Sequence, residues 1–260
     1  MDDGLLVASE SWSGTSEHHA PGDSLSAAAL LSPLLAPAHH LLQSAAPTRV
    51  RLRARETIWR GGECADRALL IASGWAYRFH RLEDGSRQIV SFLLPGDVTP
   101  LAALVQPEAP VSYGVRTVTD VDAYSLDLAK VRALLLNSPR LMELLLQALL
   151  QQSEEVERRV TDLGVRSAPS RVAQLVLEIE AKLVSRGLAR AHAFAFPIRQ
   201  EDLARATGLT LVHLNRTLVQ LRRHGYLDYS RGVMNILDPQ GLRRLVAEVT
   251  TTFVRRTPGL

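Results

Sequence analysis

Residues Phe196 to Asp238 read FPIRQEDLARATGLTLVHLNRTLVQLRRHGYLDYSRGVMNILD, and this stretch decides the fold. Apolar residues among polar ones predict a short half-buried helix over Arg199 to Thr207. Gly208 then supplies the backbone freedom that a tight turn between helices requires. Because Thr210 is positioned to cap a following helix, the pattern predicts a helix-turn-helix.

The second of these helices is predicted to have one apolar face and one polar face that contacts DNA bases, called here the reading face. Its apolar stripe follows helical spacing and consists of Leu211, Leu214, Leu218 and Leu221. The other face carries side chains suited to base edges in a major groove, namely Val212, His213, Asn215 and Arg216. Two apolar runs, Tyr226 to Tyr229 and Val233 to Leu237, flank Ser230-Arg231-Gly232 and predict the hairpin of a wing.

The net charge of the C-terminal part of the chain is opposite in sign to that of the rest. From residue 165 onward there are 15 Lys and Arg against 7 Asp and Glu, a net charge of +8, whereas the rest carries a net charge of −5. Concentrated positive charge on one part favours contact between that part and phosphates. The residues assigned to DNA phosphates are Thr210, Gln220, Arg222, Arg223 and Arg231.

Composition limits the other classes of protein. The 260 residues, of which 46% are apolar, suffice for two folded domains, and no uninterrupted apolar stretch is long enough to span a bilayer, so a cytoplasmic protein is expected. Cys64 is the only cysteine, which excludes an internal disulfide and a four-cysteine cluster. Residues 1–23 lack periodicity and are predicted to be a disordered tail.

Residues 48 to about 126 have the character of a compact antiparallel roll. Short runs rich in β-branched and aromatic residues alternate with turns such as Glu83-Asp84-Gly85-Ser86 and Pro95-Gly96-Asp97. The predicted strands are Val50 to Ala54, Thr57 to Trp59, Leu69 to Ala72, Ala76 to Leu82, Gln88 to Leu94, Val111 to Thr119 and Val121 to Leu126.

A heptad pattern follows the roll and predicts a dimerisation helix. Its seam consists of Met142, Leu146, Leu149, Ser153, Val156, Val160 and Leu163, with the serine as the one polar position. The first half is predicted to pack on the roll and the second half to pair with another chain. Gly164 is predicted to stop this helix, and Ser167 with Pro169 to start the next one beyond a hinge.

Roll, long helix, hinge and basic winged helix, in this order, resemble the Crp/Fnr family of dimeric bacterial transcription regulators over roughly residues 48 to 245. The specific segments are SGWAYRFHRLEDGSRQIVSFLLPGD, at 73–97, and QEDLARATGLTLVHLNRTLVQLRRHGYL, at 200–227. The resemblance implies an effector-binding-like β-roll, a coiled-coil dimer helix and promoter binding as a two-fold dimer. Double-stranded DNA, a second copy of the chain and RNA polymerase are the implied partners, and no membrane.

The chain departs from the family's effector-binding patterns. Members that bind cyclic AMP carry Gly-Glu after the Pro-Gly-Asp turn and Arg-Ser or Arg-Thr about ten residues later, where this chain has Pro100-Leu101 and Val111-Ser112. An anionic phosphate would lose its charge-assisted partner, typically worth about 1.5 to 3 kcal/mol. The N-terminal cysteines that hold an iron–sulfur cluster in another branch are absent, so no cofactor is expected.

The reading helix departs as well. Many relatives place Glu, two other residues and then a Ser-Arg or Gly-Arg pair along this helix, whereas the matching positions here are Val212 and Asn215-Arg216. The arginine fork can bind guanine, but valine cannot accept a hydrogen bond from cytosine, so the expected DNA half-site differs from that of those relatives.

The predicted fold class is therefore α+β, with an N-terminal antiparallel β-roll, a long coiled-coil dimerisation helix and a C-terminal winged helix-turn-helix. The predicted division is residues 1–23 as a tail, 24–136 as the roll with an N-terminal helical segment, 137–164 as the dimerisation helix, 165–245 as the DNA-binding domain and 246–260 as a C-terminal tail. The main alternative is a sensor or interaction module whose winged helix binds a protein. An enzyme is not expected, because no nucleophile, metal or phosphate-loop pattern emerges.

Overall fold

The computed structural model describes residues 47–190 and 192–255, with side chains up to residue 247. Two antiparallel four-stranded sheets form the roll, and each strand of one sheet packs toward the other across a shared core. The predicted tail and N-terminal helical segment, residues 1–46, lie outside the described residues, as do residues 256–260.

The roll contains the seven predicted strands, one of them shortened, and the two-residue strand β6 (Val98–Thr99), which was not predicted. The first sheet contains β1 (Thr48–Leu52), β8 (Val121–Asp127), β3 (Arg67–Ser73) and β6 (Val98–Thr99), in that order. The second contains β2 (Thr57–Trp59), β7 (Gly114–Thr117), β4 (Ala76–Arg81) and β5 (Arg87–Leu93). The strand predicted from Val111 begins only at Gly114, because Val111 instead bonds to the loop at Gly62 and Glu63.

Three helices follow the roll, and the first of them was not predicted. The helix α2 (Leu128–Asn137) is capped by Asp127, whose carboxylate accepts from the amide of Lys130 at 3.0 Å. A single residue, Ser138, then caps α3 (Pro139–Val165). The predicted start of the next helix is confirmed, since Ser167 caps α4 (Ala168–Ser185).

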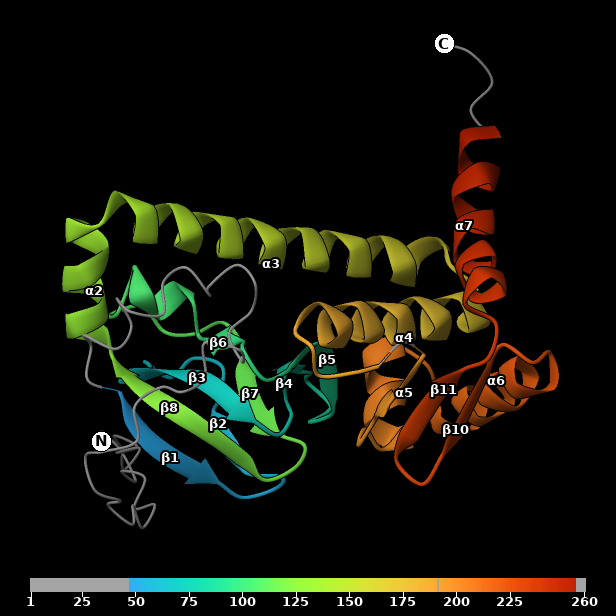
Figure 1. Cartoon of the computed structure of the whole chain (residues 1–260), viewed down its shortest axis with the longest axis horizontal. Coiled ribbons are helices and arrows are strands. Elements are labelled where there is room, and N and C mark those ends of the chain that lie inside the picture. The colour runs from blue at the N-terminus through green and yellow to red at the C-terminus, as the bar shows by residue number, and fades with distance from the viewer. Residues whose placement is uncertain (1–46, 191, 256–260) are drawn as a thin grey trace, which may run out of the picture.

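The end of α3 corrects one prediction. Gly164 lies inside the helix, which ends one residue later, and the chain turns where Arg166 and Ser167 adopt extended backbone conformations. An interior glycine costs a helix only about 1 kcal/mol, so it does not by itself stop one. The two-residue link turns α4 back antiparallel along α3 (Figure 1).

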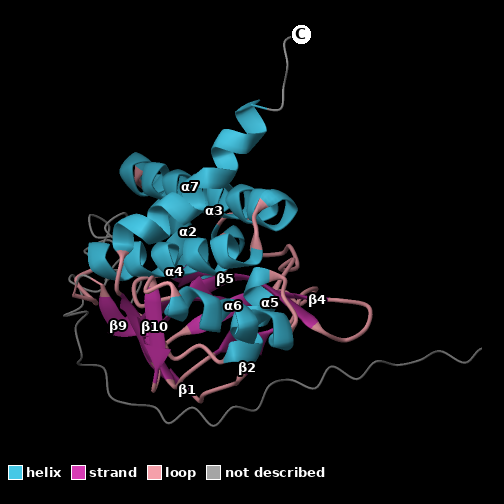
Figure 2. Cartoon of the chain, turned by 90° about the vertical axis from the view of Figure 1, so that its right-hand side faces the viewer, coloured by secondary structure: helices cyan, strands magenta, loops and turns pink. Residues whose placement is uncertain are grey.

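The winged helix completes the chain. It contains β9 (Ala193–Ala195), α5 (Gln200–Thr207), α6 (Leu211–Arg223), β10 (Leu227–Ser230), β11 (Val233–Ile236) and α7 (Pro239–Arg255). The last helix passes the boundary predicted at residue 245 and runs ten residues into the predicted tail. Seen from the winged-helix end, α4 lies between α3 and the strands (Figure 2).

The roll and the winged helix share one buried apolar cluster. Trp75, which directly precedes β4, Tyr77 of β4 and Phe92 of β5 lie in the same cluster as Phe196 and Leu203 of the winged helix. The rings of Trp75 and Phe196 meet edge to face at 6.2 Å. Burial raises the pKa of Tyr77, and the nearby carboxylate of Asp202 raises it further. The winged helix is therefore docked on the roll.

Candidate nucleic-acid interface

The helix α6 presents two chemically different faces. Leu214, Leu218 and Leu221 are buried in the winged-helix core, as the stripe predicts. Leu211, predicted to belong to that stripe, is instead 41% exposed, because it is the first residue of the helix and lies beyond the edge of the core. The Thr210 hydroxyl accepts from the amide of His213 at 3.2 Å, which confirms the predicted cap.

The structure brings the four predicted base-reading residues together on the exposed side of α6: Val212, His213, Asn215 and Arg216. Gln220 and Arg223 follow Arg216 at i+4 and i+7, so they continue the same face toward the end of the helix. Val219 is 48% exposed between them and was missed, although its i+3 spacing from Arg216 indicates this position. The surface is one continuous stripe, suited to a groove.

The turn before α6 is rigid and locally determined. Gly208 ends α5 in the left-handed region at a φ of 63°. The hydroxyl of Thr207 donates to the carbonyl of Leu203 at 2.8 Å, and the amide of Leu209 donates to the carbonyl of Ala204. Arg171 of α4 donates to the carbonyl of Thr207 at 2.9 Å. These contacts fix the direction in which α6 leaves the turn.

The wing has the predicted hairpin and a third strand. Arg231 and Gly232 both have positive φ, at 50° and 74°, as a two-residue hairpin turn requires. The strand β9 pairs with β11 and was missed, because three residues without flanking turn signals give no pattern. The Tyr229 hydroxyl donates to the carbonyl of Ile198 at 2.8 Å, and burial raises its pKa.

The predicted phosphate residues differ in what they contact. Arg222 is already engaged, since its guanidinium lies 2.5 Å from the Asp228 carboxylate and donates to the carbonyl of Tyr229 at 2.8 Å. In the part of the chain that the structure describes, Arg216, Arg223 and Arg231 form no ion pair. All three are exposed. Arg222 therefore supports the wing, and the other three offer free charges to an anion.

Of the four residues predicted to stand at the cyclic-AMP-binding positions of other members, three are buried apolar residues. Leu101 and Val111 are 8% and 5% exposed, Pro100 is buried, and Ser112 is exposed. A residual cavity of about 30 Å³ beside Leu101 is lined only by apolar side chains. The Cys64 thiol is exposed, and among the described residues no three His, Cys, Asp or Glu side chains are grouped as metal ligands would be.

The first half of the predicted seam packs only in part on the roll, and the second half is exposed. Leu141, Leu144, Leu145 and Ala148 belong to the roll core, and Met142 and Leu149 are half-buried against it. The seam residues left exposed are Leu146 at 54%, Ser153, Val156 at 40%, Val160 at 66% and Leu163 at 39%. Leu150, at 64% exposure, extends this apolar surface and was not assigned to the seam. Leu163 also lies against the turn glycine Gly208 of its own chain.

No single described helix combines the length and apolar character that crossing a bilayer requires. Among the helices that the structure describes, α2 and α3 are the one pair that together reach that length and composition, and they meet at a bend of 114°.

A roll, a long helix with an exposed apolar seam and a winged helix with a free arginine-bearing face define a DNA-binding transcription regulator. Two family models match the chain: a cyclic nucleotide-binding domain over residues 49–138 and a Crp-like helix-turn-helix domain over residues 170–245. Together they cover the roll and the winged helix. The chain belongs to the Crp/Fnr family.

Individual relatives are distant but span most of the chain. The CRP-like cAMP-activated global transcriptional regulator of Mycobacterium tuberculosis is 24% identical over 188 residues, 72% of this chain and 83% of the relative. The nitrogen fixation regulation protein FixK of Bradyrhizobium diazoefficiens is 25% identical over 199 residues, 76% of this chain and 82% of the relative. The structure of FixK2 from Bradyrhizobium japonicum has a TM-score of 0.68 at 24% identity and covers 76% of this chain and 96% of its own. That likeness confirms the fold.

Proposed function

We propose that the chain binds a two-fold symmetric promoter site as a homodimer, with the α6 helices of its two subunits in successive major grooves. The observation that carries this proposal is the exposed, unpaired guanidinium of Arg216 at the centre of the α6 face. An arginine fork on a rigid helix can take guanine O6 and N7 together, which discriminates by about 1 to 3 kcal/mol per base pair. The two grooves lie about 34 to 36 Å apart in such sites.

The residues of α6, its N-cap and the wing divide into those that contact base edges and those that contact phosphates. Arg216 and Asn215 read base edges through hydrogen bonds, His213 adds a contact at the rim, and Val212 touches a thymine methyl group. Arg223, Arg231, Gln220 and the exposed Thr210 hydroxyl bind phosphates and set the register of the helix. Arg222 is paired with Asp228 of the wing, so only the exposed part of its side chain is available to a phosphate.

The homodimer forms along α3. Leu146, Leu150, Val156 and Val160 leave apolar surface in water on one side of this helix, while its opposite side is buried in the roll core. A second copy of the same helix, related by two-fold symmetry, would cover that surface with itself. Because this dimer contains two winged helices related by two-fold symmetry, both can bind one DNA duplex.

Cyclic AMP is not the effector in this proposal. Leu101 and Val111 occupy the positions of the ribose-binding Glu and phosphate-binding Arg and are packed into the roll core. A buried phosphate without a cationic partner would pay its full desolvation cost. The protein acts in the cytoplasm, where promoter DNA and RNA polymerase are present, and neither an iron–sulfur cluster nor another cofactor is required.

Selection of bound fragments from random DNA tests the proposal directly. The expected result is a palindromic site with two half-sites about one helical turn apart, bound with a steep salt dependence from phosphate contacts. A gel shift repeated at several salt concentrations separates this function from the alternative in which the winged helix binds a protein. Selected DNA without two-fold symmetry, or binding insensitive to salt, would contradict the proposal.

A further inference from the structure

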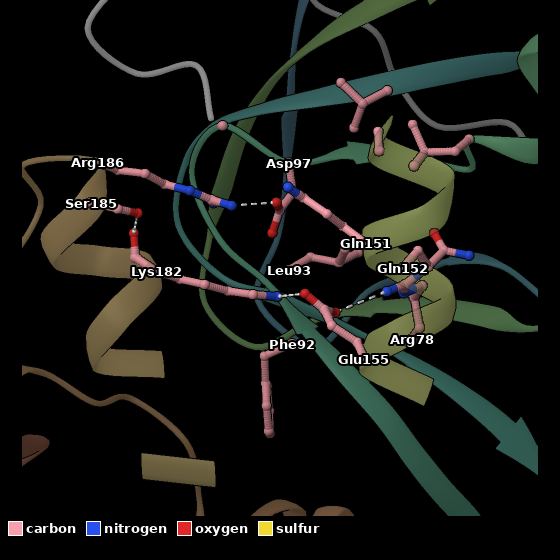
Figure 3. Close-up of a pocket in the computed structure, with 14 residues that line it drawn as sticks. Arg78, Phe92, Leu93, Asp97, Gln151, Gln152, Glu155, Lys182, Ser185 and Arg186 are labelled. Atoms are coloured by element: carbon pink, nitrogen blue, oxygen red, sulfur yellow. Dashed lines mark hydrogen bonds and ion pairs between the residues drawn. The ribbon is translucent and has the colours of Figure 1, made fainter. Parts of the chain in front are cut away.

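Three elements meet at a cleft of about 240 Å³ between the roll, α3 and α4 (Figure 3). Arg186, the residue that follows α4, reaches across it to the Pro95-Gly96-Asp97 turn of the roll. Its two terminal nitrogens bind separate acceptors, the carbonyl of Pro95 and the carboxylate of Asp97, each at 2.7 Å. The side chains of Arg186 and Asp97 are only 5% and 19% exposed. This arrangement is a clamp between the roll and the DNA-binding domain.

Two ion pairs of Glu155 connect α3 to α4 and to the roll beside this clamp. Glu155 of α3 lies 2.5 Å from the ammonium of Lys182 on α4 and 3.8 Å from the guanidinium of Arg78 on β4. Arg78 is buried and donates to the Ser91 hydroxyl at 2.7 Å. Glu155 therefore joins α3, the roll and α4. Its partner Lys182 lies one helical turn before Arg186.

The clamp lies at the end of α4 that is farthest from its link to α3, so it limits rotation of α4 relative to α3. The first residue of α4 is joined to α3 by only two residues, so Ser167 is the pivot of any rotation of α4 relative to α3. Such a rotation is opposed by the Arg186 clamp, by the ion pairs between α3 and α4, and by the apolar cluster shared with the roll. With 18 residues, α4 is about 27 Å long, and a rotation of about 10° at the pivot moves its far end by roughly 5 Å. Because Arg186 lies at that far end, small rotations would separate it from Asp97.

The rest of the winged helix follows α4. Val172, Leu175, Val176 and Ile179 of α4 are fully buried in one cluster with Leu214 and Leu221 of α6, so the two helices form one packed unit. A constraint on the far end of α4 is therefore a constraint on the position of α6.

We infer that Arg186 and Asp97 are positioning residues that fix the distance of each α6 from the dimer axis and so set the half-site spacing that the dimer accepts. This inference rests on the proposed function, since half-site spacing exists only for a dimer on a two-fold site. In the clamped structure the α6 face that carries Arg216 is exposed, so the arrangement that the clamp holds leaves this face free to meet DNA. Loss of the clamp removes one restraint on the far end of α4, while the shared apolar cluster keeps the winged helix docked on the roll. The position of each winged helix about Ser167 then varies more widely, and the dimer tolerates spacings that it otherwise rejects.

The test uses full-length protein and a series of duplexes that carry the selected half-sites at the selected spacing and at one and two base pairs shorter or longer. The variant Arg186→Ala is compared with Arg190→Ala, which removes the same charge from an exposed position four residues away. We expect the ratio of affinities between the best spacing and its neighbours to fall by about fivefold or more for Arg186→Ala and to stay at the wild-type value for Arg190→Ala.

The variant Arg186→Lys keeps the charge but replaces two separate donor nitrogens with a single one, so it cannot reproduce the bridge between the Pro95 carbonyl and the Asp97 carboxylate. We therefore expect an intermediate spacing preference even if Arg186→Ala folds poorly. Affinity for a duplex with one half-site should change equally in Arg186→Ala and Arg190→Ala, because the reading face is intact in both. A wild-type spacing preference retained by Arg186→Ala and Arg186→Lys would overturn this inference alone. A wild-type protein without any spacing preference would overturn the proposed function and the inference with it.

Discussion

Leu163, the last residue of the α3 seam, lies against Gly208, the turn glycine of the helix-turn-helix. A Cβ atom at position 208 would lie 2.7 Å from the Cδ2 atom of Leu163 and 3.3 Å from the Nη1 atom of Arg171. The φ of 63° requires the glycine, and a Cβ atom there would in addition force the end of the Leu163 side chain to shift. The end of α3 and the turn that orients α6 are therefore packed directly against each other.

Gly208→Ala should destabilise the protein by more than backbone strain alone. The left-handed conformation costs a residue with a Cβ about 1 to 2 kcal/mol, and the contact with Leu163 adds to this. Gly225→Ala is the matched control, because Gly225 has a φ of 70° but open space around its Cβ position. In urea unfolding, Leu163→Ala should reduce the cost of Gly208→Ala and leave that of Gly225→Ala unchanged. Equal effects on both would refute the contact as the cause.

Arg216→Ala and Arg223→Ala should separate reading from anchoring. We expect Arg216→Ala to weaken binding to the selected site by about 1 to 3 kcal/mol and to relax base preference at one position, because its fork reads a base. Arg223→Ala should weaken binding to all sequences alike and reduce the salt slope by about 1. Affinities on selected and scrambled duplexes at several salt concentrations measure both effects. A change of base preference in Arg223→Ala would reverse the assignment.

Arg222→Ala should behave unlike Arg223→Ala, although the two residues are adjacent. The Arg222 guanidinium is paired with Asp228 and half-exposed, so its removal should lower the free energy of unfolding by about 1 kcal/mol or less. Because that charge is already balanced, the salt slope of DNA binding should change less than in Arg223→Ala. Salt-dependent binding of both variants, with urea unfolding alongside, gives the comparison. Identical salt slopes would show that Arg222 also binds a phosphate.

Val160→Glu should break the dimer. Val160 is 66% exposed on the α3 seam, and a carboxylate there would face its own symmetry mate across an apolar interface. Leu136→Glu is the control, since Leu136 is 72% exposed on α2, away from the seam. Sedimentation should find Val160→Glu monomeric at concentrations where wild type and Leu136→Glu are dimeric. A dimeric Val160→Glu protein would place the interface elsewhere.

The clamp at Asp97 predicts a pH dependence of stability. Burial alone opposes ionisation of this carboxyl, but Arg186 and Lys182 outweigh it and hold the pKa of Asp97 below its ordinary 3.8. A depressed pKa means that the stabilisation is complete above the ordinary pKa and is lost as the pH falls through the folded one. The difference in unfolding free energy between wild type and Asp97→Asn should therefore be constant near neutral pH and shrink below about pH 4. A difference that persists unchanged to pH 3 would contradict the ion pair.

The sequence by itself determined the features that depend on near neighbours in the chain. The Thr210 and Ser167 caps, the Gly208 turn, the wing hairpin and the exposed position of Arg216 all follow from residues within one or two helical turns of each other. Local backbone conformation and helical periodicity act over that range, so pattern alone predicts them.

Only the tertiary structure decided which groups cover which faces. The pairing of Arg222 with Asp228, the third wing strand β9, the docking of the winged helix on β4 and β5, and the clamp between Asp97 and Arg186 all depend on how elements are brought together. The last of these joins residues 89 positions apart. Periodicity shows that a face is buried but carries no information about its partner, which the path of the whole chain determines.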